Sequence, residues 1–383
     1  MAIKTQSKLP NVGTTIFTVM SQMATEYNAI NLSQGFPDFP VSEKLIDLVY
    51  QNMQIGHNQY APMPGLPQLR EAIANKIKNT GGVSLNIDTE ITVSAGATEA
   101  IFSSILATVH QGDEVIVLEP AYDCYIPAIE LAGGKVVPVG LNLPDFSPNW
   151  QKVKDNITDK TRMIVINFPH NPSGAILTEA DITALKEILE ENPQLIILSD
   201  EVYEHIIFDG KTNLSVLKDE FLASRSIAVS SFGKTFHATG WKIGYMVAPE
   251  ALMKEIRKVH QYNCFSVHTP SQYAMAEYLQ HEQNYLGVSA MYEKKREFFQ
   301  QAMQDSKFKV IPSYGTYFQV LDFSEVSDMG DMEFAQYLIK EKGVASIPVS
   351  AFYSDKQDNK LLRFCFAKGE ETLQKAADIL CKI

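Results

Sequence analysis

The 383-residue sequence has little of what marks several protein classes. Its four cysteines are far apart and form no CxxC motif, which argues against a disulfide framework and suits a reducing compartment. No run approaches the roughly 20 apolar residues of a membrane helix, and the opening MAIKTQSKLPNVGTT lacks the apolar core of a secretory signal. There is no basic block, and the net charge of −12 disfavours nucleic acid and anionic membranes as partners.

The composition is that of a folded globular protein. Apolar residues make up 45% of the chain and charged residues 20%. At roughly 100–200 residues per domain, the length predicts two or three units. We therefore expect an acidic, cytoplasmic protein of enzyme size.

Between residues 90 and 250, short β-rich runs alternate with helical stretches. Several runs, such as MIVIN and LIILS, are almost continuously apolar, which is typical of strands covered by helices on both faces. The expected strands are Ile91–Val93, Glu114–Leu118, Lys135–Val139, Met163–Asn167, Leu195–Ser199, Ser226–Ser231 and Ile243–Val247. This alternation predicts an α/β fold with a mainly parallel sheet.

The pattern changes after residue 250. Two long helices are predicted, over Pro249–Asn263 and Pro270–Gln304, and the second is long enough to link two domains. The strands and helices that follow are in a looser order, which predicts a smaller α+β unit. We expect residues 1–36 to form an N-terminal arm and part of the small domain, residues 37–279 a large domain, and residues 280–383 the C-terminal small domain.

The segment SSFGKTFHATGWKIGY contains the most informative lysine. Lys234 follows a predicted buried strand and stands beside Ser231 and a glycine. An isolated lysine is usually a solvated loop residue. The carboxyl ends of strands in α/β sheets, however, form ligand crevices, where a lysine of lowered pKa can form a Schiff base.

Polar residues also follow the neighbouring predicted strands. Asp200 and Tyr203 come directly after LIILS, where a buried carboxylate needs a cationic or protonated partner. The plain alternatives are a helix N-cap for Asp200 and a packing aromatic for Tyr203. A metal site with His205 is disfavoured, because no second histidine lies at ligand spacing. Asn171 lies in a turn after MIVIN, and Ala97 and Thr98 open a helix whose N–H groups suit a phosphate.

Together, the order and spacing of these segments resemble the class I, fold-type I aminotransferases that use pyridoxal 5′-phosphate (PLP). The resemblance runs from about residue 12 to the end and includes NLSQGFPDF, NQYAPMPG and Arg363 in LLRFCFA. It is strongest to the branch that holds bacterial methionine aminotransferase and kynurenine aminotransferase/glutamine transaminase K. It implies a large PLP-binding domain, a smaller α+β domain, and a ping-pong transfer of an amino group to a 2-oxo acid.

The resemblance assigns a role to each matching residue around the cofactor ring. Lys234 would form the Schiff base and move the proton, and Asp200 would pair with the ring nitrogen. Tyr203 and Asn171 would bond the phenolic oxygen, and Tyr122 would stack on the ring.

The resemblance also implies how the phosphate is held. The phosphate would be bound by Ala97, Thr98, Ser231 and Lys242. Many relatives have an arginine at the position of Lys242, and a lysine keeps the positive charge but cannot make the arginine's bidentate contact. Tyr60 would reach the neighbouring subunit's phosphate, which implies a homodimer with shared sites. A turn-packing aromatic is the plain alternative for Tyr60.

On the substrate side, Arg363 would bind the α-carboxylate with help from Asn171 and a backbone contact from Gly35. The plain alternative for Arg363 is a surface ion pair. Phe17 and Phe36 are expected to line an apolar side-chain pocket, with Ile16, Phe39 and Tyr122 as further candidates and Phe39 more in keeping with the core. Such a pocket favours methionine, with phenylalanine, tyrosine, leucine, glutamine, histidine and kynurenine as other donors.

Three other functions are alternatives to an aminotransferase. A PLP-dependent carbon–sulfur β-lyase uses the same lysine, aspartate and arginine, so the sequence separates it poorly from an aminotransferase. A PLP-fold sensor domain of a transcription regulator needs a fused DNA-binding module. This sequence has no basic N-terminal extension that could form one. A nicotinamide dehydrogenase needs a glycine-rich fingerprint after an early strand, and none is present.

Overall fold

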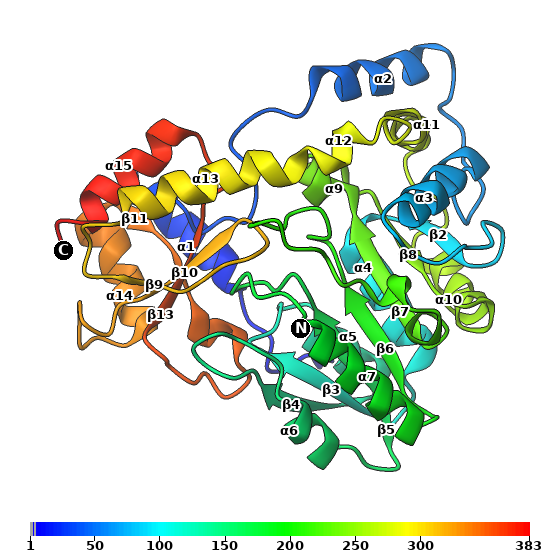
Figure 1. Cartoon of the computed structure of the whole chain (residues 1–383), viewed down its shortest axis with the longest axis horizontal. Helices are drawn as coiled ribbons and strands as arrows, with labels where there is room; N and C mark the ends of the chain where they lie inside the picture. Colours follow the sequence, from blue (N-terminus) through cyan, green and yellow to red (C-terminus); the bar gives the residue numbers. More distant parts are fainter. Residues whose placement is uncertain (1–2, 4) are drawn as a thin grey trace.

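A seven-stranded sheet forms the centre of the computed structural model, which describes residue 3 and residues 5–383 (Figure 1). Its order is β2-β8-β7-β6-β5-β3-β4, and β8 is antiparallel to both of its neighbours while the other pairings are parallel. The strands are β2 (Ile91–Ser94), β3 (Glu114–Glu119), β4 (Lys135–Gly140), β5 (Thr161–Asn167), β6 (Ile196–Asp200), β7 (Ser226–Ser231) and β8 (Gly244–Val247). The predicted α/β fold and all seven predicted strands are confirmed.

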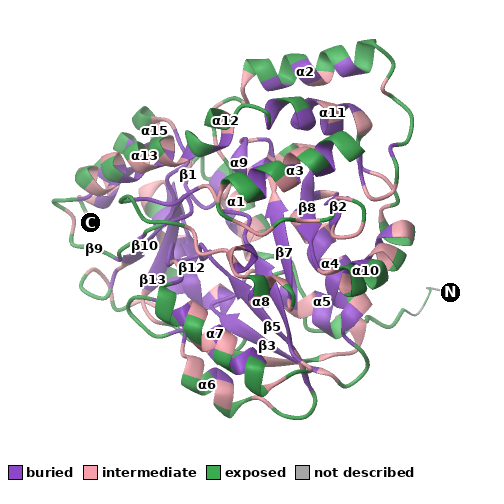
Figure 2. Ribbon diagram, turned by 45° about the vertical axis from the view of Figure 1, so that its right-hand side comes forward, coloured by how far each residue is buried: buried purple, intermediate pink, exposed green. Residues whose placement is uncertain are grey.

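Helices cover both faces of this sheet, which explains why its strands are apolar without alternation. Along β5, Met163 and Val165 pack into one core and Ile164 and Ile166 into another. The first core is completed by α4 (Gly96–Thr108), α5 (Tyr125–Ala132) and α10 (Glu250–Asn263), and the second by α3 (Pro67–Asn79), α6 (Trp150–Asp155) and α7 (Glu179–Glu191). Figure 2 shows the buried sheet between helices whose outer faces are exposed.

The start of α7 follows the sequence signal closely. Thr178 accepts a hydrogen bond from the N–H of Asp181, and the Asp181 carboxylate accepts one from the N–H of Thr178. This reciprocal capping satisfies two donors that a helix start otherwise leaves without partners. The predicted N-cap at Thr178 is therefore confirmed.

The single helix predicted over residues 270–304 is wrong. The chain forms α11 (Thr269–Tyr278), α12 (Gln283–Leu286) and α13 (Val288–Ala302) instead. The side chain of Asn284 donates to the carbonyl of Tyr278, an acceptor that a continuous helix would use for its own backbone. Gly287, a poor helix former, separates α12 from α13.

A third core lies in the C-terminal part of the chain. Its four-stranded sheet has the order β12-β13-β10-β9, formed by β9 (Lys309–Val310), β10 (Phe318–Asp322), β12 (Ile347–Pro348) and β13 (Leu361–Cys365). The N-terminal segment joins this part, because β1 (Ile30–Asn31) pairs with β11 (Val344–Ala345) and α1 (Ile16–Glu26) contributes to the same core. Helices α14 (Asp331–Tyr337) and α15 (Glu370–Leu380) complete this core, while α2 (Glu43–Gln54) packs on α11. The domain boundary near residue 280 stays a prediction.

Among the described residues, no helix combines the length and the apolar composition that a membrane crossing requires.

Candidate active site

The polar segments singled out in the sequence meet at one edge of the seven-stranded sheet. Parallel strands β5, β6 and β7 are neighbours, so the residues at or just beyond their carboxyl ends, among them Asn171, Asp200 and Lys234, lie at the same edge. Because β8 is antiparallel, its first residue pairs with the last residues of β2 and β7, which brings Lys242 to the same edge. The topology therefore collects segments far apart in the sequence around one crevice.

A cavity of about 320 Å³ occupies this edge. Every predicted site residue except Tyr60 lines it: Phe17, Gly35, Phe36, Ala97, Thr98, Tyr122, Asn171, Asp200, Tyr203, Ser231, Lys234, Lys242 and Arg363. Tyr60 lies on the surface, 81% exposed, with its ring against Phe265. Neither Ile16 nor Phe39 is among the lining residues, and Phe39 packs against His237 and Tyr292, in keeping with a core role.

The lysine amine is held in a setting that weakens its positive charge. Burial lowers the pKa of Lys234 to about 8. Its Nζ lies 3.3 Å from the carbonyl oxygen of Gly35, to which it donates, and within 6 Å of the ring centres of Tyr203 and Tyr317. An amine with a pKa near neutral provides an appreciable unprotonated fraction, which nucleophilic and proton-transfer chemistry requires.

Asp200 is a buried carboxylate with two hydrogen bonds. Its Oδ2 accepts from the Tyr125 hydroxyl at 2.6 Å and its Oδ1 from the N–H of Val202 at 3.2 Å. Burial raises the pKa of Asp200 to about 6, while these two donors oppose the rise. Such a group is suited to hold a cationic partner inside the cavity.

A chain of amide contacts connects this carboxylate to the arginine. The side chain of Asn167 donates to the carbonyl of Asp200 and accepts from the N–H of Asn171. The side-chain oxygen Oδ1 of Asn171 in turn accepts from Nη1 of Arg363 at 2.9 Å. The Nδ2 group of Asn171 therefore remains as a donor with no partner among the described residues.

Arg363 is fully buried and held by more than one kind of contact. Its Nη2 donates to the carbonyl of Ser33 at 2.8 Å, and its guanidinium lies 4.0 Å from the ring centre of Phe318. Its Nε is buried and has no hydrogen-bond partner among the described residues. Among the described residues, no carboxylate forms an ion pair with Arg363, and its side chain is buried, so the alternative of a surface ion pair is wrong. A buried arginine with an open donor is suited to a planar carboxylate.

The opposite end of the cavity is suited to an anion. Gly96, at φ +76°, begins α4, and a side-chain carbon there would lie 3.2 Å from Nζ of Lys242. The close approach brings this cation against the first turn of α4, which carries Ala97 and Thr98, and Ser231 lies beside them in the cavity. A helix start with a lysine and hydroxyl groups provides what a phosphate group needs.

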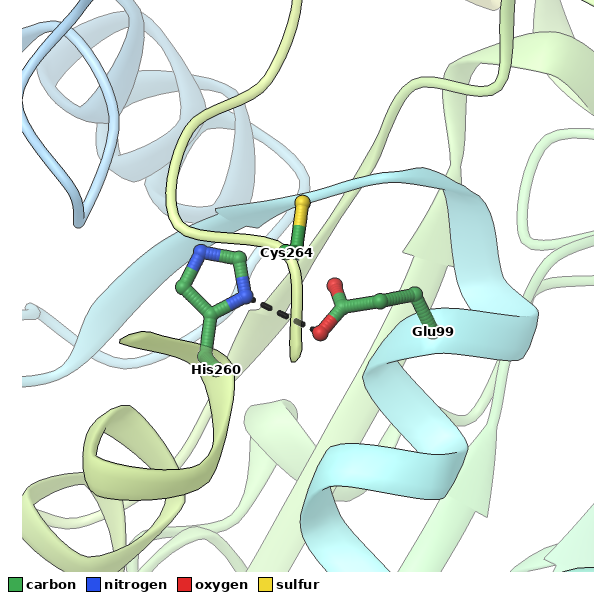
Figure 3. Close-up of side chains that lie close together, drawn as sticks. All are labelled: Glu99, His260 and Cys264. Atoms are coloured by element: carbon green, nitrogen blue, oxygen red, sulfur yellow. Dashed lines mark hydrogen bonds and ion pairs between the residues drawn. The ribbon is translucent and has the colours of Figure 1, made fainter. Parts of the chain in front are cut away.

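Hydrogen bonds of Glu99 and His260 also hold the first turn of α4 in place. Figure 3 shows Glu99 of α4 hydrogen-bonded to Nδ1 of His260 at 2.9 Å, with Cys264 nearby. Glu99 also accepts from the N–H of Ala95, and Nε2 of His260 donates to the carbonyl of Met63. These contacts join α4 to α10 and to the segment that carries Tyr60.

The comparisons with known proteins agree with this geometry. The model of the family "Aminotransferase class I and II" matches residues 27–380. The chain belongs to the class I and II aminotransferases. It is 48% identical over 376 residues to a methionine aminotransferase of Escherichia coli, covering 98% of this chain and 97% of that one.

Two further relatives place this aminotransferase within its family. A solved structure from Escherichia coli, described as having a methionine aminotransferase function, matches with a TM-score of 0.97 and 47% identity over the whole of both chains. A kynurenine–oxoglutarate transaminase of Dictyostelium discoideum is 33% identical over 421 residues, covering 99% of this chain and 96% of that one. The family and branch inferred from sequence are confirmed.

Several residues of this aminotransferase site were not singled out from its sequence. Asn167, Gln34 and Phe318 line the cavity, and Tyr125 and Tyr317 bond groups that line it. Asn167 is the last residue of the predicted strand Met163–Asn167, and Tyr125 lies three residues after Tyr122, so both are next to segments that the sequence does indicate. Tyr317 and Phe318 come from the C-terminal part, and only the folded chain brings them to the site.

Proposed function

We propose that this aminotransferase binds PLP in the cavity and moves the amino group of a neutral, extended L-amino acid, methionine foremost, to a 2-oxo acid. The observation that carries the proposal is the union of Lys234, Asp200 and Arg363 in one cavity whose far end suits a phosphate. When bound, PLP links to the amino acid and accepts the electrons that remain when the α-carbon loses its proton.

The residues present fit this cofactor. The first turn of α4, with Ala97 and Thr98, would hold the phosphate together with Ser231 and Lys242. At the other end, Asp200 would pair with the protonated ring nitrogen, because a buried carboxylate gains from a cationic partner. Tyr203 and the unpartnered amide of Asn171 would donate to the ring oxygen, and Tyr122 would pack on the ring face.

The substrate would be held by its α-carboxylate. Arg363 would bind this carboxylate beside Asn171, with the Gly35 backbone adding a contact, and this fixes the α-carbon near Lys234. The Nζ of Lys234 then takes the proton from the α-carbon, which its lowered pKa permits. Arg363 thus binds and orients the substrate, and Lys234 moves the proton.

The side-chain part of the cavity supports a neutral substrate. Phe17, Phe36 and Phe318 line it, and burying apolar surface favours an extended apolar side chain by roughly 25 cal/mol per Å². The cations among its described lining residues are Lys234, Lys242 and Arg363, and each already has a proposed role. The similarity to an Escherichia coli methionine aminotransferase supports the same substrate class.

We also propose that the enzyme is a homodimer in which Tyr60 reaches the neighbouring subunit's phosphate. Tyr60 is 81% exposed and packs on Phe265. Ile55, five residues before Tyr60, and Tyr262, three residues before Phe265, are also exposed, at 70% and 91%. Large exposed apolar residues around one segment are typical of a protein–protein interface.

Reduction with borohydride tests the central assignment. The purified protein incubated with PLP should be labelled on the peptide that contains Lys234, and Lys234→Ala should lose transamination by orders of magnitude. Lys242 provides the internal comparison, since it is the other lysine of the cavity. A label on Lys242 with Lys234 unmodified would contradict the proposal.

A further inference from the structure

The carbonyl oxygen of Gly35 is shared by two donors. The Tyr317 hydroxyl donates to it at 2.6 Å, and Nζ of Lys234 donates to it at 3.3 Å. Tyr317 is completely buried, so its hydroxyl is held without competition from solvent. The short bond belongs to the neutral tyrosine and the long, weak one to the amine.

Contacts to the residues just before Gly35 help to fix the position of this carbonyl. The N–H of Cys365 donates to Leu32 at 2.8 Å, and Arg363 donates to the carbonyl of Ser33. A side-chain carbon on Gly35 would lie 2.9 Å from the Phe318 ring, so the segment also packs closely against β10. The Gly35 carbonyl is therefore a firmly placed acceptor at the reacting amine.

Of the groups that face the Lys234 amine, some raise its pKa and others lower it. Asp200 from β6 and Cys365 from β13 favour its charged form, whereas Arg363 from β13 and Lys242 before β8 oppose it. The rings of Tyr203 and Tyr317 also lie within the range at which aromatic faces attract a cation. Burial is the largest influence and lowers the pKa of the amine. A strong backbone acceptor would work against this, because a hydrogen bond to the ammonium favours the charged form.

We propose that Tyr317 is a positioning residue that occupies the Gly35 carbonyl, so that this carbonyl holds the free amine of Lys234 in place without strongly stabilising its charged form. The inference rests on the proposed role of Lys234 as the group that moves the proton. Tyr317 acts through Gly35 and need not touch substrate or cofactor. Without its hydroxyl, the carbonyl becomes a stronger acceptor for the ammonium group.

The variant Tyr317→Phe tests this in the cofactor-free full chain. Trace acetylation with acetic anhydride across a pH series, read by peptide mass spectrometry, gives the midpoint at which Lys234 becomes reactive, with exposed Lys254 as the internal reference. The midpoint should rise by about half a pH unit or more in Tyr317→Phe, because the ammonium gains a better acceptor. An unchanged or lower midpoint would overturn the inference.

Tyr292→Phe is the matched control. Tyr292 is also buried, packs 5.5 Å from Tyr317, and bonds His237, three residues beyond Lys234. Its hydroxyl bonds His237 instead of the Gly35 carbonyl, so the Lys234 midpoint should stay at the wild-type value. An equal rise in both variants would mean general loosening and would also overturn the inference.

A second measurement works even if Tyr317→Phe folds poorly. Placing 3-fluorotyrosine at position 317 strengthens the donor with little change in volume, so the midpoint should fall below the wild-type value. A rise would contradict the role given to the hydroxyl.

In the PLP-loaded enzyme, the low-pH limb of kcat should move upward in Tyr317→Phe. The borohydride label reports separately on Lys234. If borohydride labels Lys234 but the acetylation midpoint does not rise in Tyr317→Phe, the inference about Tyr317 is wrong while the proposed role of Lys234 stands.

Discussion

Tyr125 donates its hydroxyl hydrogen to Oδ2 of Asp200 across 2.6 Å. The tyrosine belongs to α5, which follows β3, and the aspartate ends β6, so the bond joins two elements 75 residues apart. Both groups are buried. Because a donor to a carboxylate stabilises its charged form, Tyr125 keeps Asp200 closer to ionisation than burial alone would.

Removing this hydroxyl should weaken cofactor binding. In Tyr125→Phe, the pKa of Asp200 should rise further above its present value of about 6, so less carboxylate is available near neutral pH. A hydrogen bond to a charged group contributes roughly 1.5–3 kcal/mol, so we expect PLP affinity to fall by about tenfold or more. The pH above which PLP binds tightly should move upward.

Fluorescence titration with PLP at several pH values measures both effects. Tyr285→Phe is a suitable control, since Tyr285 is also buried but lies on α12, outside the cavity. Wild-type affinity and pH dependence in Tyr125→Phe would show that the bond has no influence on Asp200.

The neighbouring carboxyl of Glu201 should reduce stability as pH rises. Burial raises its pKa to about 7, from an ordinary value of 4.5. Below pH 4.5 both the folded and unfolded chains are protonated there; between 4.5 and 7 only the folded chain retains the proton. The free energy of unfolding therefore decreases across this window, by about 1–3 kcal/mol from this group.

Glu201→Gln should remove that part of the decrease. The glutamine carbonyl can still accept from Ser199 and the N–H of Val216, as Oε1 of Glu201 does. Urea unfolding of the cofactor-free chain, followed by tryptophan fluorescence, should show the variant to be more stable than wild type at pH 8 and similar at pH 4.5. Equal stability at both pH values would contradict the raised pKa.

Glu204→Gln is the opposite comparison. Burial favours protonation of Glu204, but Lys76 and His205 outweigh it and lower its pKa to about 2. Lys76 lies 2.6 Å from this carboxylate and is itself buried. Losing the negative charge leaves a buried lysine without its partner, so this variant should be less stable than wild type at neutral pH.

The sequence predicted the sheet and most of the cavity for physical reasons that can be named. Strands such as MIVIN are apolar on both faces, and residues at their carboxyl ends must share one edge, so Asn171, Asp200 and Lys234 could be grouped without coordinates. The resemblance then added Arg363, whose partner Asn171 is 192 residues away. No local pattern indicates a contact of that separation.

What the sequence could not indicate depends on geometry between distant segments. Tyr317 resembles any strand-edge aromatic until folding brings it to Gly35, 282 residues earlier. The sequence does not indicate the break between α11 and α13, because its helical pattern continues through it. The break involves a single side-chain hydrogen bond, from Asn284 to the carbonyl of Tyr278, which no periodic pattern predicts. Periodicity reports which face is buried, and it does not report such single bonds.

Mixing two inactive variants tests the shared sites. Tyr60→Ala should lose the partner's phosphate contact and Lys234→Ala the reacting amine, so each should be impaired alone. In a hybrid dimer, one site combines an intact Lys234 with an intact Tyr60 from the other chain. Equal mixing should recover up to about one quarter of wild-type activity, since half the dimers are hybrids with one good site each. No recovery despite demonstrated subunit exchange would indicate that each site is built from one chain.

The charge of the substrate side chain provides the sharpest test of specificity. A dicarboxylic amino acid such as aspartate needs a second cation for its distal carboxylate, because burying an unpaired carboxylate is costly. Among the described residues that line the cavity, Arg363 is the only arginine. In the proposed arrangement, Lys234 supplies the reacting amine and Lys242 binds the phosphate, so neither is free for a distal carboxylate. His268 bonds Ser271 at the start of α11 and does not line the cavity.

We therefore expect methionine to exceed aspartate in kcat/KM by at least about a hundredfold, equivalent to roughly 2.7 kcal/mol in the transition state. The apolar surfaces of Phe17, Phe36 and Phe318 favour the methionine side chain at about 0.8 kcal/mol per buried methylene, whereas aspartate gains nothing from them. Half-reaction kinetics with the two donors, read from the cofactor's absorbance, measure the ratio directly. Phe36→Arg offers a matched variant, since a cation at this half-exposed position should narrow the ratio by improving aspartate. Comparable kcat/KM values in the wild-type enzyme would mean that a cation from outside these residues, such as one from a partner subunit, reaches the pocket, and the neutral-substrate proposal would then be wrong.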